Sequence, residues 1–308
     1  MNAILLCPGQ GAQSLGMGKS WFESSPAARD VFATADKILA DDFQSPISEL
    51  CFEGAAERLN QTDAAQPALY TCAIASYNAL REQFGDEFAH PICTAGLSLG
   101  EYTALHLAGV FSFEDGLRLV AKRGKYMQQA ALVSSGGMVA VTRPTDEEAE
   151  QICEKARQND VLVCANYNAP GQIVLSGSKP ACERAVAIAS EMGHRATVLT
   201  VAGAFHSDLM APAAERMAEA LDECSFSTPK CPVVSNVTAE PHDAEHLDRM
   251  KELLVKQIVS PVKWNQSCVW IVNTMDGEFH ELAPGKVLTG LMRRINRETK
   301  VINHDQPK

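Results

Sequence analysis

The feature that most constrains the fold is the segment Gly96-Leu97-Ser98-Leu99-Gly100, a GxSxG pattern between two apolar stretches. Residues 91–95 before it have strand character, and residues 99–107 after it have helical periodicity that ends near Gly109. Small residues on both sides let the chain turn sharply and hold the serine in a tight, exposed conformation. The pattern alone is common, so a glycine-rich turn without chemistry explains it as well as a nucleophile does.

The regions on both sides of this segment alternate strands with helices, which predicts an α/β layer structure with a parallel sheet. We expect strands at residues 2–7, 91–95, 232–234 and 278–282. We expect helices at residues 25–40, 64–84, 99–107, 114–132, 208–224, 245–259, 264–275 and 286–295.

The middle of the chain has a different rhythm. Strands are expected at residues 138–141, 161–165, 172–175 and 195–199, with helices beginning at Thr145 and spanning 179–192. This β-α-β-β-α-β order is the ferredoxin-like pattern. The sequence therefore predicts a small domain, residues 135–202, inserted into a larger catalytic domain made of residues 1–134 and 203–308.

Composition excludes several classes of protein. The formal net charge of −11 argues against a nucleic-acid-binding protein, which needs a basic face. The N-terminal apolar run stops at Pro8-Gly9, too short for a signal peptide or a membrane span. The ten cysteines stand singly, without CxxC pairs or histidines at zinc-ligand spacing. We therefore expect a cytoplasmic protein with reduced thiols, no metal and no membrane partner.

Two further segments could complete a site around Ser98. A serine nucleophile needs a base, and His206 lies on a loop of small residues where the chain leaves the small domain. The turn Pro8-Gly9-Gln10-Gly11 follows the first strand, and its glycines let the Gln10 backbone N–H approach a ligand closely. Taken separately, a loop histidine and a plain tight turn are the simpler interpretations.

Together with other motifs, these segments resemble the family of malonyl-CoA:acyl carrier protein transacylases, acyltransferases of fatty acid and polyketide synthesis. The resemblance covers nearly the whole chain. The matching segments are Pro8-Gly9-Gln10-Gly11, Gly96–Gly100 with Glu101-Tyr102, Arg123-Gly124-Lys125, Ala165-Asn166-Tyr167-Asn168, Pro170-Gly171-Gln172, Ala204-Phe205-His206-Ser207, Ser235-Asn236-Val237, Gln257, Pro261-Val262 and Pro284-Gly285-Lys286-Val287-Leu288. It implies an α/β-hydrolase-like large domain with a parallel sheet core and a ferredoxin-like insert.

The resemblance also implies roles for particular residues. Ser98 would be the nucleophile and His206 its base, with an oxyanion hole formed by the backbone N–H groups of Gln10 and Leu99. Arg123 would grip the free carboxylate of the malonyl group, and the backbone carbonyl of Gln257 would orient His206. From the residues alone, Arg123 and Gln257 are as well explained as exposed helix residues, and Asp208 is the nearest acidic candidate for a third member beside His206. The substrates implied are malonyl-CoA and holo-acyl carrier protein, with no cofactor.

The chain departs from the usual pattern of the family at Leu97, which precedes the nucleophile where bacterial members usually have histidine. Phe205, before the base, is expected to crowd an α-methyl group and so to favour malonyl over methylmalonyl.

An acidic carrier protein needs a basic docking patch, and the candidates are Lys122, Arg123, Lys125, Lys263, Lys286, Arg293 and Arg294. A monomer is expected.

Other functions are compatible with the same residues. A trans-acting polyketide acyltransferase, or the transacylase subunit of a malonate decarboxylase, would use the same chemistry with other partners. A serine hydrolase or thioesterase would pass the acyl group to water, and Arg123 and the Gln10 loop argue against it. An intact Ser98, His206 and Arg123 argue against a non-catalytic carrier-binding module.

Overall fold

The computed structural model describes residues 2–307, without the side chains of residues 86 and 87. A parallel sheet in the order β7-β2-β1-β8-β9 forms its centre. The middle strand β1 is buried along its whole length, as expected of a strand covered on both faces. The strands are β1 (Ala3–Cys7), β2 (Cys93–Gly96), β7 (Val233–Val234), β8 (Glu278–Leu282) and β9 (Val301–His304).

Helices cover both faces of this sheet because β1 alternates its side chains between two apolar cores. Leu5 and Cys7 belong to the larger core, and Ile4 and Leu6 to the smaller one. The larger core is closed by helices that include α2 (Pro26–Ile38), α5 (Thr62–Phe84), α7 (Gly100–Leu107), α8 (Phe113–Ser134), α11 (Ala211–Asp222) and α12 (Leu247–Val259). The smaller one is closed by α13 (Trp264–Thr274) and α14 (Val287–Ile295).

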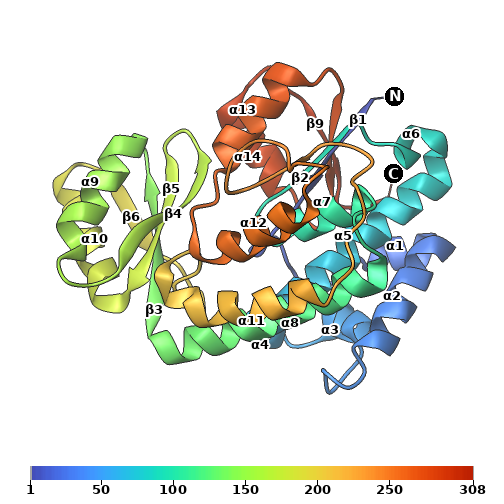
Figure 1. The fold of residues 1–308 in the computed structure, drawn as a ribbon, viewed down its shortest axis with the longest axis horizontal. Helices are drawn as coiled ribbons and strands as arrows, with labels where there is room; N and C mark the ends of the chain where they lie inside the picture. Colours follow the sequence, from blue (N-terminus) through green and yellow to red (C-terminus); the bar gives the residue numbers. More distant parts are fainter. Residues whose placement is uncertain (1, 308) are drawn as a thin grey trace.

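A second, separate sheet lies at the other end of the molecule (Figure 1). Its strands run antiparallel in the order β4-β5-β3-β6, with two helices packed on one face. Its elements are β3 (Gly136–Thr142), α9 (Asp146–Arg157), β4 (Leu162–Ala169), β5 (Gln172–Ser178), α10 (Lys179–Glu191) and β6 (Arg195–Val198). The predicted fold class, with a parallel sheet and a smaller β-α-β-β-α-β unit, is confirmed. The domain boundaries at residues 134/135 and 202/203 stay a prediction.

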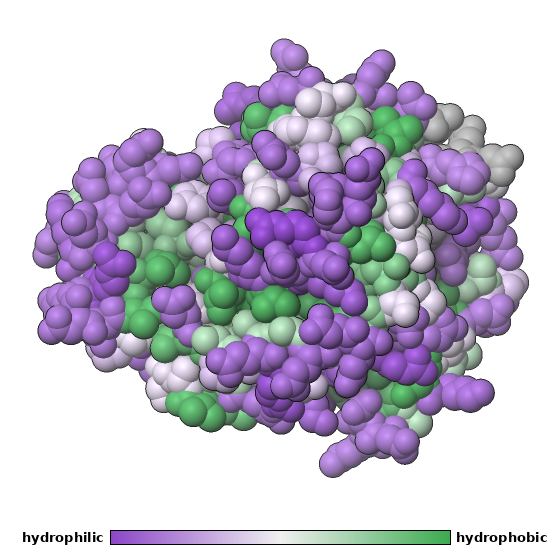
Figure 2. All heavy atoms as spheres, in the orientation of Figure 1, coloured by the Kyte–Doolittle hydropathy of each residue, from purple (hydrophilic) through white to green (hydrophobic). Residues whose placement is uncertain are grey.

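Besides the covalent connections, backbone hydrogen bonds join the small antiparallel part to the larger part. Tyr167 N–H of β4 donates to the Val262 carbonyl over 2.9 Å, and Val262 N–H donates to the Ala165 carbonyl over 2.8 Å. Apolar surface is visible between the two parts (Figure 2). Leu132 and Val133, at the end of α8, are exposed. Within residues 2–307, no helix combines the length and apolar character that crossing a membrane requires.

Some elements differ from those expected. Five short ones were not predicted: α1 (Lys19–Ser24), α3 (Ile47–Glu53), α4 (Ala56–Leu59), α6 (Asp86–Ala89) and β9. The helix expected over residues 208–224 begins as a 3₁₀ turn, η1 (Asp208–Met210). The strand expected at residues 138–141 begins two residues earlier, at Gly136, because Ser135 in the left-handed region (φ 45°) makes the turn.

Candidate active site

Ser98 sits at the sharp turn between β2 and α7, in a backbone conformation that few residues adopt. Its φ of 53° is in the left-handed region, which costs a non-glycine residue about 1–3 kcal/mol. The flanking glycines allow the turn because a Cβ on Gly96 would lie 1.9 Å from the Gly100 carbonyl, and one on Gly100 would lie 2.1 Å from the Cys7 oxygen. The predicted strand-turn-helix context of Ser98 is therefore present.

His206 lies against Ser98, although 108 positions separate the two residues. Its Nε2 is 2.9 Å from Ser98 Oγ, and its Nδ1 is 2.7 Å from the backbone oxygen of Gln257. Because a carbonyl only accepts, Nδ1 carries the proton and Nε2 is left to accept from the serine hydroxyl. His206 also has a positive φ, 58°, so both members of this pair are held in strained conformations.

The Gln257 carbonyl is free to accept from His206 because of its position near the end of α12. Gln257 is in the last turn of α12, where a helix leaves its carbonyls without intrahelical partners. The residue four positions on is Pro261, which has no N–H to donate. Asp208, the acidic residue that is nearest in sequence, is therefore not the partner of Nδ1.

The environment of His206 keeps its ring neutral. Burial, and then the positive charge of Arg123, lower the pKa of His206 from 6.5 to about 4, while the hydrogen bond to Gln257 opposes the shift. A neutral imidazole is the form that can take a proton from serine.

Arg123 lies inside the molecule and not on a helix surface. Its side chain is 1 % exposed. Nη1 donates to Gln66 Oε1 over 2.7 Å, and Nη2 donates to Gln257 Oε1 over 2.8 Å and to Ser98 Oγ over 3.2 Å. Tyr102 also lies against the guanidinium, with its ring centroid 5.5 Å from Arg123 Cζ. The three hydrogen bonds use three of the five N–H groups of the guanidinium, which thus stands beside the nucleophile with donors left for another group.

Three polar residues around this site were not assigned roles from the sequence: Gln66, Asn236 and Glu101. Asn236 follows β7, the neighbour of β2, so its position at the carboxyl edge of the sheet could have indicated it. Ser98 N–H donates to Asn236 Oδ1 over 2.7 Å, and Asn236 Nδ2 donates to the Gly96 carbonyl over 2.8 Å. Glu101, in the first turn of α7, is completely buried. The site thus includes residues to which the resemblance assigned no role.

The Gln10 loop packs directly on the turn that carries Ser98. A Cβ on Gly9 would lie 2.1 Å from the Leu97 oxygen, so only glycine allows this approach. The Gln10 side chain donates to Thr62 Oγ1 over 3.3 Å. In residues 2–307, the backbone N–H groups of Gln10 and Leu99 donate to no protein acceptor. Their use as an oxyanion hole stays a prediction.

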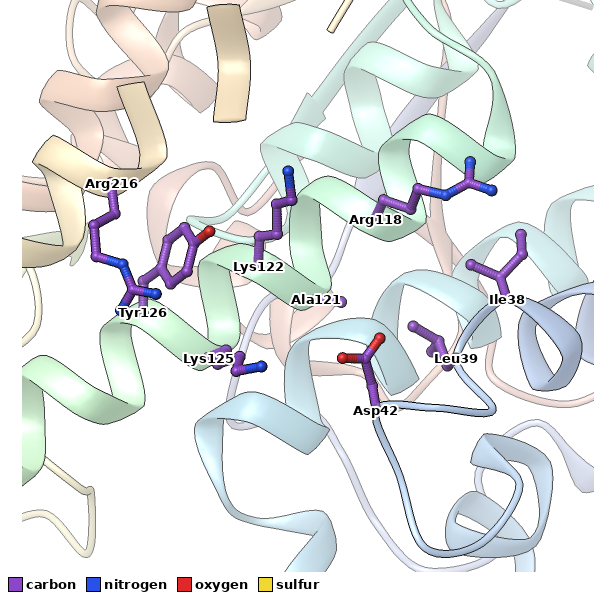
Figure 3. Close-up of a pocket in the computed structure, with 9 residues that line it drawn as sticks. All are labelled: Ile38, Leu39, Asp42, Arg118, Ala121, Lys122, Lys125, Tyr126 and Arg216. Carbon is purple, nitrogen blue, oxygen red and sulfur yellow. The ribbon is translucent and has the colours of Figure 1, made fainter. Parts of the chain in front are cut away.

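The basic residues considered for carrier docking do not form one patch. Lys122 and Lys125 lie on α8, whereas α14 packs on the other side of the sheet and carries Arg293 and Arg294. Arg123 is buried and cannot contribute. The α8 face borders a surface pocket of about 370 Å³ (Figure 3), lined by Ile38, Leu39, Asp42, Arg118, Ala121, Lys122, Lys125, Tyr126 and Arg216.

Comparisons with known proteins agree with this geometry. The model of the acyl transferase domain family matches residues 4–304. The chain is 43 % identical over 305 residues to the malonyl CoA-acyl carrier protein transacylase of Bacillus subtilis, covering 98 % of this chain and 93 % of that protein.

Solved structures are similar over the same length. The acyl-carrier-protein-S-malonyltransferase from Bartonella henselae superposes with a TM-score of 0.93 at 40 % identity, covering 99 % of this chain and 96 % of that chain. A malonyl-transacylase in complex with its type II PKS acyl-carrier protein superposes with a TM-score of 0.93 at 34 % identity, covering 100 % and 97 %.

Proposed function

Because the chain belongs to the acyl transferase domain family, we propose that it moves a malonyl group from malonyl-CoA to the phosphopantetheine thiol of an acyl carrier protein. The product would supply fatty acid synthesis. The cycle uses two substrates and no cofactor, and we place it in the cytoplasm with a monomeric enzyme.

The observation that carries this proposal is the contact of Ser98 Oγ with both a neutral base and a buried cation. His206 Nε2 is 2.9 Å from Ser98 Oγ, and Arg123 Nη2 is 3.2 Å from it. In a malonyl thioester, one methylene separates the reacting carbonyl from the free carboxylate. A site for that group therefore needs a carboxylate-binding group next to its nucleophile, and a guanidinium suits a carboxylate best.

The reaction proceeds in two transfers. Ser98 Oγ attacks the thioester carbonyl while His206 Nε2 takes its proton, and the tetrahedral intermediate collapses as the proton passes to the sulfur of coenzyme A. The carrier thiol then gives its proton to His206 and attacks the acyl-serine, which restores the Ser98 hydroxyl. In both steps the N–H groups of Gln10 and Leu99 are proposed to hold the oxyanion, beside the N-terminus of α7.

Arg123 supplies the selectivity for a charged acyl group in this scheme. The guanidinium N–H groups that do not bind Gln66, Gln257 or Ser98 support the assignment, since a substrate carboxylate can accept from them. The bound carboxylate also offsets the charge that lowers the pKa of His206, so substrate binding strengthens the base.

A second candidate keeps the chemistry and changes the partner. The similar malonyl-transacylase solved with a type II PKS acyl-carrier protein supports a polyketide carrier as the alternative acceptor. Assays with a fatty acid carrier and a polyketide carrier side by side separate the two.

Intact-mass measurement after brief incubation with malonyl-CoA tests the proposal. We expect a malonyl-sized adduct on the wild type and none on Ser98→Ala. Steady release of coenzyme A without an adduct or a carrier would instead indicate a hydrolase, and neither adduct nor release would refute malonyl-CoA as the substrate.

A further inference from the structure

One buried carboxylate, that of Glu101, connects the groups that hold the nucleophile. Its Oε2 accepts from Asn236 N–H over 3.1 Å and from Gln257 Nε2 over 2.7 Å. Its Oε1 is 2.6 Å from His242 Nε2, and the side chains of both residues are completely buried. A carboxylate is almost never buried this completely unless it is paired, so each of these contacts is needed to keep it there.

Both backbone polar groups of Ser98 depend on residues that bind Glu101. Ser98 N–H donates to Asn236 Oδ1 over 2.7 Å, and Gln257 Nε2 donates to the Ser98 carbonyl over 2.9 Å. Ser98 has a strained backbone conformation, and such a conformation persists only where several surrounding contacts hold it in place. Asn236 and Gln257 make these contacts with the Ser98 backbone, and Glu101 holds both of them in position.

Glu101 also decides which way the Gln257 amide points. A carboxylate can only accept and a guanidinium can only donate. Gln257 lies between Glu101 and Arg123, so its NH₂ must face the carboxylate and its Oε1 must face Arg123 Nη2, at 2.8 Å. If the amide were reversed, its oxygen would face the Glu101 carboxylate and its NH₂ would face the Arg123 guanidinium. Acceptor would then meet acceptor, and donor would meet donor. Glu101 thereby holds the guanidinium beside Ser98.

We infer that Glu101 is a positioning residue for acyl transfer: through Asn236 and Gln257, its carboxylate sets the backbone of Ser98 and the orientation of Arg123. It touches neither substrate nor reacting atoms. The inference rests on the proposed function in one respect, namely that the reaction Glu101 supports is the acylation of Ser98.

The test compares Glu101→Ala with Glu281→Ala. Glu281 is a matched control because it is also completely buried and accepts from Leu288 N–H, Thr289 N–H and Thr289 Oγ, but it caps α14 and does not contact the site. Rapid-quench acylation by malonyl-CoA gives the burst amplitude, which counts folded sites, and the rate constant of the burst.

For Glu101→Ala we expect the acylation rate constant of the folded fraction to fall about 100-fold, the typical effect of an ångström-scale misplacement. For Glu281→Ala we expect loss of amplitude or melting temperature with an unchanged rate constant. A Glu101→Ala enzyme with reduced amplitude and a wild-type rate constant would show a purely structural role and overturn the inference.

Glu101→Gln keeps the test decisive if the alanine variant does not fold. Its amide oxygen can accept from Asn236 and Gln257, and its NH₂ can donate to His242 in the other tautomer. We therefore expect a rate constant near that of the wild type. A folded Glu101→Gln enzyme that reacts about 100-fold slower would overturn positioning through these hydrogen bonds.

A fluorophosphonate probe separates this inference from the proposed function, because it labels an activated serine without any acyl-CoA. Labelling rates of the three variants should follow the same order as acylation. A wild type that is labelled by the probe but not malonylated would refute the proposed substrate, while the comparison at Glu101 would still be decided.

Discussion

Replacing Arg123 with alanine should damage malonyl transfer far more than acetyl transfer. The guanidinium is 1 % exposed, so a malonyl carboxylate bound to it is shielded from water, and removing the cation leaves that charge buried and unpaired. Breaking a buried pair in this way costs about 3–5 kcal/mol. At 1.36 kcal/mol per factor of ten, kcat/KM for malonyl-CoA should fall about 10²- to 10⁴-fold.

The matched substrate is acetyl-CoA, which has the same thioester and no carboxylate. Its kcat/KM should change by less than about tenfold, because for it only contacts within the enzyme are lost, those of Arg123 with Ser98 Oγ, Gln66 and Gln257. The assay is coenzyme A release with both substrates, with circular dichroism to confirm folding. Equal losses for the two substrates would refute the assignment of Arg123 to the carboxylate and would place its effect on Ser98 alone.

Three other predictions follow from the same geometry. Because the base must be neutral and the pKa of His206 in the free enzyme is lowered to about 4, kcat/KM for acylation should stay level from pH 8 to about 5 and fall as the pH drops through 4; an inflection near 6.5 in kcat/KM would contradict this. The folded pKa lies below the ordinary value, so the stability that neutral His206 provides is present above pH 6.5 and lost towards pH 4, and folding must be checked by circular dichroism at each pH. Phe205→Ser should raise the ratio of methylmalonyl to malonyl transfer in a competition assay, because Phe205 is buried next to the base, and an unchanged ratio would remove it as a selectivity residue. Lys125→Glu with Arg216→Glu should raise KM for an acidic carrier several-fold and leave acylation by malonyl-CoA unchanged, since both line the α8 pocket away from Ser98; equal carrier kinetics would exclude this face as the docking site.

The sequence predicted the architecture well where its pattern was long or sharp. The GxSxG turn and the β-α-β-β-α-β rhythm were both recognisable because they combine glycine positions with extended periodicity. Short elements such as α3, α4 and β9 were missed because they span seven residues or fewer, too few to establish a period, and are fixed by tertiary packing.

Two features of the site could have been predicted from local sequence rules that the family motifs do not include. Arg123 lies three positions after Val120 and four before Met127, both buried, so its place on the apolar stripe of α8 already indicated burial. Pro261 likewise indicated a free carbonyl at Gln257. The role of Glu101 was not readable, because its partners Asn236 and Gln257 are 135 and 156 positions away and only the fold brings them together.

The most direct test of the central claim is the fate of the isolated acyl-enzyme. The wild type is loaded with malonyl-CoA, freed of excess substrate, and divided between buffer alone and buffer with holo-acyl carrier protein. We predict that the adduct on Ser98 persists in buffer and disappears with the carrier, as the carrier gains a malonyl-sized mass. Loss of the adduct at the same rate in both halves, without a mass gain on the carrier, would contradict transfer and identify water as the acceptor.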